Sequence, residues 1–247
     1  MRSGYTLPVF ASASAIAALQ CLQQSTTNAN KSLVTVDLIT PPQSVEISIE
    51  QVALIQSGMA LGITHSDPGD NLDLTRDTPI WAVVEWADPS QVETIALVGG
   101  EGVGKQSNLE NRPAIYDYAR RLLQANLAPL LTPGQKIRVT IILPEGRILA
   151  TRTSNAAFGV VEGLSLLGTT GISQPLSAPG QLDACLAQLR AKWSGGDDGQ
   201  LEDRNVVESF LPLVFCIGEN GLDLAQQMGI GRDQIIKTAN WLGPLLA

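Results

Sequence analysis

Histidine, cysteine and charged side chains are all scarce in this chain of 247 residues. Its single histidine, His65, excludes every site that needs two imidazoles, such as the HExxH zinc motif. The three cysteines, Cys21, Cys185 and Cys216, lie far apart and are odd in number. This pattern excludes a disulfide framework and a CxxC metal site, and it fits a reducing cytoplasm. We therefore expect a cytoplasmic chain with no metal site of its own.

Long apolar runs and an excess of positive charge are also missing. No apolar run approaches the roughly 18 to 20 residues that a membrane-spanning helix needs, so we expect no membrane association. The apolar stretch near the N-terminus is interrupted by Pro8 and continues into an Ala-rich helical pattern, which we interpret as part of the fold rather than a secretion signal. A net charge of −8 disfavours nucleic acid as a partner. The 44% hydrophobic content is sufficient for a buried core.

Hydrophobic patterns predict an order of strands and helices that is typical of an α+β fold. Apolar periodicity and composition predict helices over residues 9–24 and 113–125, and strands over 34–39, 45–49, 80–86, 92–98 and 137–143. Short turns join neighbouring strands, and the strict alternation of strand and helix is missing. We therefore expect a mixed or antiparallel sheet with packed helices.

The composition changes toward the C-terminus, where a Gly- and Asp-rich stretch follows residue 193. Beyond it, a buried-type strand over 211–217 precedes a helical pattern over 222–228, an arrangement typical of α/β domains. We predict an α+β main domain over residues 1–193, a linker over 194–205 and the start of a smaller, Rossmann-like α/β domain over 206–247.

A glycine-rich segment, Gly99-Gly-Glu-Gly-Val-Gly104-Lys105, follows a predicted strand and matches the GxxxxGK pattern of phosphate-binding loops. Gln106 occupies the position of the Mg²⁺-binding Ser or Thr, and no helical pattern begins until Pro113. We expect a tight backbone loop that can also border a ligand. A nucleotide hydrolase would instead release phosphate in a reaction lost in Lys105→Ala, and we expect no such release.

An acidic segment, residues 66–77, contains Asp67, Asp70, Asp73 and Asp77. The spacing fails as an EF-hand calcium loop because the twelfth position is Thr78. Two interpretations remain open. The acidic side chains can form Asx turns that stabilise their own backbone, or they can contact a ligand or substrate.

Two further turns, residues 152–156 and 168–171, are rich in hydroxyl and amide groups and bracket an apolar stretch. Such turns can bind a polar small molecule in an apolar cleft, or they can cap helices. His65 lies just before the acidic segment, and a packed or capping role is favoured over a catalytic triad.

Four segments, in order, resemble the CbiD family of cobalt-precorrin-5B C1-methyltransferases of anaerobic cobalamin biosynthesis, and in particular its cyanobacterial members. The matching segments are residues 2–6, 66–75, 99–104 and 154–177. The chain departs from the family at Leu7-Pro-Val-Phe-Ala11, where most members have a Thr-Gly-Thr-Cys-Ala type of sequence. Most members also continue beyond the point that matches residues 240–243, so we expect this chain to lack the C-terminal part.

The resemblance implies transfer of a methyl group from S-adenosyl-L-methionine to C1 of a cobalt-bearing corrinoid, which gives cobalt-precorrin-6A. Cobalt would enter only as part of the substrate. Methyl transfer from a sulfonium is an in-line displacement that depends mainly on positioning, so no catalytic triad is expected. The alternative is a non-catalytic, tetrapyrrole- or partner-binding remnant of the enzyme. A homo-oligomer is left open.

The resemblance also directs attention to particular side chains in the matching segments. We expect Asp67, Asp70 and Asp73 in the catalytic site, and the methyl donor at Gly100, Gly102, Gly104, Gly168, Thr169, Thr170 and Gly171. We expect the corrinoid at Arg76, Arg152, Ser154 and Asn155, with Arg112, Arg120 and Arg121 nearby. Arginine suits the carboxylate rim of a corrinoid because its guanidinium group binds carboxylates in a bidentate manner.

Overall fold

The computed structural model forms two compact units, Met1–Pro175 and Leu176–Ala247. It describes residues 2–24, 33–71, 73–88, 90–153 and 155–173, and the strands β13 (Leu213–Cys216) and β14 (Ile235–Thr238). β13 lies within the strand predicted over 211–217, and it pairs in parallel with β14. The linker predicted over 194–205 and the helix predicted over 222–228 lie outside the described residues.

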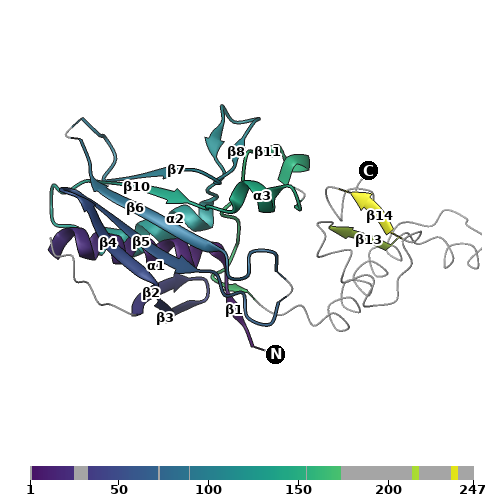
Figure 1. The fold of residues 1–247 in the computed structure, drawn as a ribbon, viewed down its shortest axis with the longest axis horizontal. Helices are drawn as coiled ribbons and strands as arrows, with labels where there is room; N and C mark the ends of the chain where they lie inside the picture. Colours follow the sequence, from purple (N-terminus) through teal and green to yellow (C-terminus); the bar gives the residue numbers. More distant parts are fainter. Residues whose placement is uncertain are drawn as a thin grey trace, which may run out of the picture. The chain divides into compact units, whose positions relative to one another are not determined.

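A five-stranded sheet is the centre of the first unit (Figure 1). In spatial order its strands are β4 (Gln51–Gln56), β5 (Met59–His65), β6 (Pro79–Trp86), β10 (Ile137–Ile142) and β7 (Ile95–Gly99). β7 and β10 are parallel, and all other neighbours are antiparallel. This confirms the predicted mixed sheet in an α+β fold.

Helix α1 (Leu7–Gln24) packs on this sheet and is surrounded by the fold. It contacts β4, β5 and β6, and also helix α2 (Asp117–Leu127) and the hairpin of β2 (Leu33–Ile39) with β3 (Pro42–Ser48). Small residues let α1 approach the sheet closely, and the Ser14 hydroxyl donates a hydrogen bond to the Ile80 carbonyl at 3.0 Å. A helix that is apolar or small on every side is typical of such a buried position.

Shorter elements border the sheet. They are β1 (Gly4–Tyr5), which pairs with β12 (Ile172–Ser173); the three-stranded sheet of β11 (Val160–Val161), β8 (Lys105–Gln106) and β9 (Arg112–Pro113); helix α3 (Gly146–Ala150); and the 3₁₀ helices η1 (Ala128–Leu130) and η2 (Asn155–Phe158). In the part of the chain that the structure describes, no helix is long and apolar enough to cross a membrane.

Two sequence-based predictions need correction in detail. Helix α2 begins at Asp117 rather than at Pro113, because Pro113 belongs to β9 and pairs with Lys105. Tyr118 is therefore the buried tyrosine of this helix, and Tyr116 is half-buried. The strand predicted over 92–98 begins only at Ile95. Strands β4 and β5 were not predicted at all.

Candidate functional site

Three strands of the sheet end at the same edge. His65 at the end of β5 pairs with Pro79, which begins β6. Ile142 at the end of β10 pairs with Trp81, and Gly99 at the end of β7 pairs with Ile141. The acidic segment, the glycine-rich segment and the segment that contains α3 therefore all leave the sheet at one edge. We call it the carboxyl edge, and such edges are common ligand sites in proteins with parallel strands.

The acidic segment is held by the N-terminal residues. The Arg2 guanidinium donates two hydrogen bonds to the Asp67 carboxylate, each 2.7 Å long. The Arg2 amide donates to the Asp70 carboxylate, and the Asp70 amide donates to the Arg2 carbonyl at 2.8 Å. The hydrogen bond from Arg2 lowers the pKa of Asp67, and an amide hydrogen bond from Gly69 adds to this effect. Asp67 is therefore an anion bound to the start of the chain.

Within the segment, Asx turns are confirmed for two of the aspartates. The Asp67 Oδ1 accepts a hydrogen bond from the Gly69 amide at 3.0 Å. The Asp73 Oδ1 accepts from both the amide and the hydroxyl of Thr75, each at 2.8 Å. Arg76 donates to the carbonyls of Gly69 and Asn71. These groups thus shape the loop, and the roles of Asp67, Asp70, Asp73 and Arg76 toward a ligand stay predictions.

The turn over residues 168–171 lies beside the acidic segment because β1 connects them. The Thr6 amide donates to the Gly171 carbonyl at 3.0 Å, and the Thr6 hydroxyl donates to the Thr170 carbonyl at 3.0 Å. The Asn71 side chain donates to the Ser173 hydroxyl. The exposed Thr169 side chain makes no hydrogen bond to another described residue, so its hydroxyl is available to a ligand.

The glycine-rich segment is a tight backbone loop, as predicted. Gly102 has a φ of +74°, and a Cβ there would lie 1.8 Å from the Leu143 carbonyl oxygen. The amides of Gly100 and Gly104 donate to the carbonyls of Ile141 and Leu164, at 2.7 Å each. Because these amides are used inside the protein, they cannot cradle a phosphate in the manner of a P-loop.

Next to this loop, the Lys105 ammonium lies 2.7 Å from the Glu162 carboxylate and lowers the pKa of Glu162. The Asn155 side chain donates to the Gly163 carbonyl at 3.3 Å, which places it beside the glycine-rich loop. Arg152 is exposed in the segment that follows α3. Ser154 lies outside the described residues.

The structure thus gathers the predicted residues into two groups. Asp67 and Asp70 lie with the 168–171 turn, and the glycine-rich loop lies with Asn155. Residues 160–173 connect the groups, since Leu164 forms a bridge with Val103 and Leu166 forms one with Ile115. Asp73 binds Thr75 in the distal part of the acidic loop, and the Arg76 side chain reaches back to the carbonyls of Gly69 and Asn71.

Sequence reasoning missed the roles of Arg2 and Glu162. Arg2 belongs to a segment that resembles the CbiD family, which was a usable signal, but no pattern links it to Asp67, 65 positions away. The His65 Nδ1 contacts the Glu50 carboxylate, so His65 has a structural partner. Among the described residues, no group of three or more His, Cys, Asp or Glu side chains could hold a metal ion.

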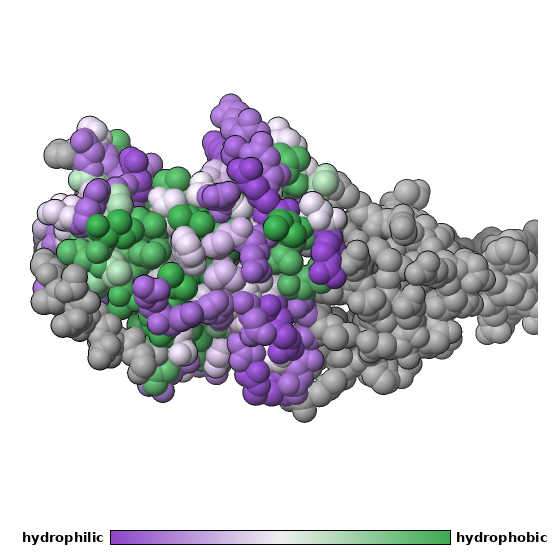
Figure 2. All heavy atoms as spheres, in the orientation of Figure 1, coloured by the Kyte–Doolittle hydropathy of each residue, from purple (hydrophilic) through white to green (hydrophobic). Residues whose placement is uncertain are grey.

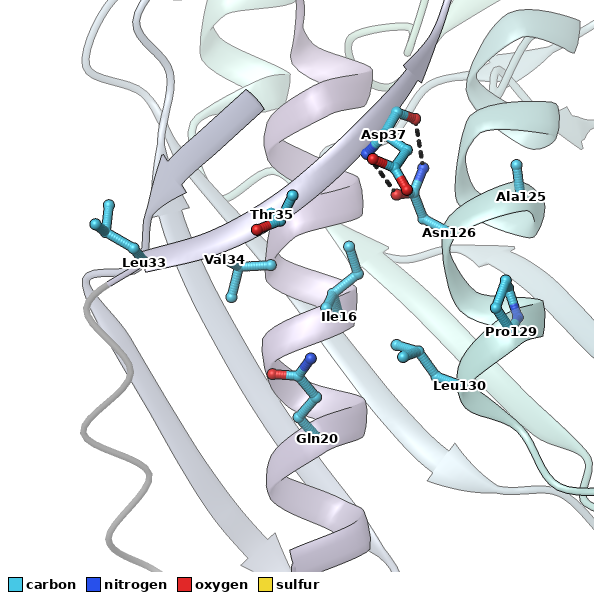
Figure 3. A pocket seen from close by; sticks show the side chains of 10 residues that line it. All are labelled: Ile16, Gln20, Leu33, Val34, Thr35, Asp37, Ala125, Asn126, Pro129 and Leu130. Atoms are coloured by element: carbon cyan, nitrogen blue, oxygen red, sulfur yellow. Dashed lines mark hydrogen bonds between the residues drawn. The ribbon is translucent and has the colours of Figure 1, made fainter. Parts of the chain in front are cut away.

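A separate cavity of about 320 Å³ lies between α1, β2 and α2 (Figure 3). Two of its polar residues bind each other: the Asp37 amide donates to the Asn126 side chain at 2.8 Å, and the Asn126 side chain donates to the Asp37 carbonyl at 2.9 Å. None of the predicted site residues lines it. The carboxyl edge therefore remains the candidate site.

The fold and its three edge loops define an α+β protein built on one mixed five-stranded sheet. A crystal structure of the cobalamin biosynthesis protein cbiD from Archaeoglobus fulgidus is similar, with a TM-score of 0.55 at 24% sequence identity. The superposition covers 92% of this chain and 73% of the Archaeoglobus chain. At this level of identity the likeness concerns the fold alone. Residues 1–175 match the CbiD family model, and the chain belongs to the CbiD family.

Curated relatives extend the match over the whole chain. A protein of Trichormus variabilis is 61% identical over 246 residues, and one of Cyanothece sp. is 59% identical over 250 residues. A protein of Gloeobacter violaceus is 48% identical over 245 residues. All three are named cobalt-precorrin-5B C(1)-methyltransferase. The chain spans 62% of the length of these relatives, and the predicted family resemblance is confirmed.

Proposed function

We propose that this chain is part of an S-adenosyl-L-methionine-dependent methyltransferase that methylates C1 of cobalt-precorrin-5B and gives cobalt-precorrin-6A. The observation that carries the proposal is the match of the whole chain to methyltransferases of that name at 48 to 61% identity. The reaction transfers a methyl group from one small molecule to another and releases S-adenosylhomocysteine, so the proposal includes no nucleic-acid or membrane partner. A cytoplasmic location follows from the cysteine content.

The carboxyl edge suits this chemistry. The electrophile is the sulfonium methyl and the nucleophile is a ring carbon, so the protein must hold both in line and exclude water. Loops fixed by backbone hydrogen bonds, such as the one closed by Gly102 and Leu164, supply such rigid positioning. Cobalt would enter as part of the substrate.

We assign the predicted residues at the carboxyl edge to the two reactants. The methyl donor would lie along the 168–171 turn and the glycine-rich loop, where the free Thr169 hydroxyl can bind its polar groups, and Asp67, Asp70 and Asp73 would face its positive charge. Arg76, Arg152, Ser154 and Asn155 would bind the corrinoid periphery. The support for this assignment is that the two groups lie on one edge of the sheet and are joined by residues 160–173.

We also propose that residues 206–247 begin an α/β domain, joined to a main domain over 1–193 by a linker over 194–205. Parallel strands need a crossover connection, usually a helix, and the parallel pair of β13 and β14 supports this arrangement. The boundary between the two compact units at Pro175 precedes the proposed linker.

Calorimetric titration of S-adenosylhomocysteine tests the proposed donor site. We expect saturable binding to this chain, because both proposed loops lie within it. A version extended to the length of the relatives serves as comparison. Binding only to the extended version would place the donor pocket partly in the added residues and would favour the alternative, a chain that binds tetrapyrrole without turnover. Binding to neither would contradict the proposed function.

A further inference from the structure

One face of the five-stranded sheet is apolar and carries no helix in the described part of the chain. Helices α1 and α2 pack against the opposite face, where Ala60, Ala82 and Val139 are fully buried. The alternate residues point the other way. We call them the open face, and they are Gln51, Ala53, Met59, Leu61, Ile63, His65, Pro79, Trp81, Val83, Glu85, Ala96, Val98, Arg138, Thr140 and Ile142. In Figure 2 apolar side chains gather over these strands.

The composition of the open face is unusual for its position. The solvent side of a mixed or antiparallel sheet is normally polar. Here three neighbouring strands align Leu61 with Val83 and Thr140, and Ile63 with Trp81 and Ile142. A contiguous apolar patch of this kind marks a binding surface.

The open face continues directly into the carboxyl edge. A Cβ on Gly100 would lie 2.7 Å from the Ile142 side chain and 3.0 Å from that of Thr140, so the glycine-rich loop borders the open face. The acidic segment joins β5 to β6 immediately beyond Ile63 and Trp81. The apolar surface and the proposed methyl-donor loops are thus adjacent.

The size of the open face favours a small ligand over a protein. Five strands about 4.8 Å apart, each about six residues long, form a flat area of about 400 Å². A stable protein interface needs about 800 Å² from each partner. A flat ligand with an apolar face fits better than a second copy of the chain.

The charges on the open face also fit such a ligand. Apart from His65, which contacts Glu50 at the carboxyl edge, its ionisable groups are Arg138 and Glu85, and the Arg138 Nε lies 3.8 Å from the Glu85 carboxylate. This distance is too long for a hydrogen bond, so the guanidinium can turn to a stronger acceptor. A carboxylate on the rim of a flat ligand is such an acceptor.

We propose that the open face is the floor on which the corrinoid ring of the substrate lies, with the Trp81 indole beneath the macrocycle and Arg138 at a rim carboxylate. The proposal rests on the proposed function and adds the place of the substrate. The ring would then lie beside the carboxyl edge, where the methyl donor is proposed to bind.

A pair of matched variants tests this floor. Val83→Glu places a long, negative side chain in the centre of the open face, and Val92→Glu makes the same change at a side chain that is 88% exposed outside it. With cobyrinic acid, a carboxylate-bearing corrinoid, as the probe, we expect Val83→Glu to raise the Kd at least tenfold and Val92→Glu to change it less than twofold. Equal Kd values for the two variants would overturn the proposal.

A second measurement follows binding on the unaltered floor and uses a variant only to assign a signal. Trp81 and Trp86 lie on opposite faces of β6, because Trp81 belongs to the open face and Trp86 packs against the core. In the chain labelled with 5-fluorotryptophan, cobyrinic acid should shift the ¹⁹F signal of Trp81 and leave that of Trp86 in place. Trp81→Phe assigns the signal. An unmoved Trp81 signal at saturation would overturn the proposal.

The remaining outcomes separate this proposal from the proposed function. Cobyrinic acid could bind the chain although Val83→Glu leaves the Kd unchanged and the Trp81 signal does not move. This result would place the corrinoid elsewhere and leave the methyltransferase proposal intact. Failure of the unaltered chain and of its extended version to bind the corrinoid would remove both. A dimer seen by light scattering that Val83→Glu dissociates would show that a second copy covers the open face instead.

Discussion

At the residue scale, the pair of Arg2 and Asp67 ties the first residues of the chain to the acidic segment. Both side chains are about half exposed, so the pair contributes little energy but fixes a geometry. The neighbouring amides hold the same geometry, because Tyr5 donates to the Asp67 carbonyl at 3.0 Å. The carboxylates thus support the loop that borders the site.

The lowered pKa of Asp67 makes this contribution dependent on pH. The folded chain binds the proton less tightly than the unfolded chain, so the stabilisation is present above the ordinary pKa of 3.8 and is lost as pH falls through the lowered value. We expect Asp67→Asn to lower the free energy of unfolding by at most about 1 kcal/mol at pH 7. In urea titrations the difference from the unaltered chain should shrink below pH 3.8. A difference that stays constant down to pH 2 would show that the charge is irrelevant.

Gly102 allows a close contact that no other residue permits. Gly102→Ala combines a positive φ with a clash against the Leu143 carbonyl, and we expect it to lower the free energy of unfolding by about 3 kcal/mol or more. Gly134→Ala is the matched control, since Gly134 also has a positive φ, +87°, but open space around it. It should cost about 1 to 2 kcal/mol. Similar losses for the two variants in urea titrations would contradict the role of the close contact.

At the element scale, helix α1 links the sheet, the β2–β3 hairpin and α2 into one core. Leu19 in this helix is fully buried, and we expect Leu19→Ala to lower the free energy of unfolding by about 2 to 5 kcal/mol. Leu109→Ala is the control at a side chain that is 47% exposed, and it should change stability by less than about 0.5 kcal/mol. A loss below 1 kcal/mol for Leu19→Ala would show that α1 is not part of the core.

The elements that could be predicted are those with an unambiguous local pattern. The Ala-rich run of α1 and the β-branched run of β10 indicate their structures directly. Strands β4 and β5 were not predicted because Gly62 in β5 and the central Val-Ala-Leu-Ile run of β4 break the alternation on which strand prediction depends. The predicted start of α2 was wrong because Pro113 pairs with Lys105 in β9, and this pairing outweighs the preference of proline for the first turn of a helix.

The candidate site was predictable as segments but not as an arrangement. The acidic segment, the glycine-rich segment and the turn over residues 168–171 stand out in the sequence. Their meeting at one edge depends on the register of β5, β10 and β7, which no local pattern encodes. The open face could not be predicted for the same reason, since part of it lies on β4 and β5, which the sequence patterns did not indicate.

At the scale of the whole molecule, two surfaces of one sheet would bind the two reactants. The carboxyl edge would hold the methyl donor, and the open face would hold the corrinoid beside it. The buried helix α1 packs against the sheet from the opposite side. The chain spans 62% of the length of its relatives, so the activity is best measured on this chain and on an extended version side by side.

Transfer of a labelled methyl group tests the central claim most directly. Cobalt-precorrin-5B is incubated with [methyl-¹³C]S-adenosylmethionine and either version of the chain, and the corrinoid is analysed by mass spectrometry and ¹³C NMR. The account predicts one labelled methyl group at C1, with transfer suppressed by S-adenosylhomocysteine. A corrinoid that stays unlabelled with both versions, although both are folded, would contradict it.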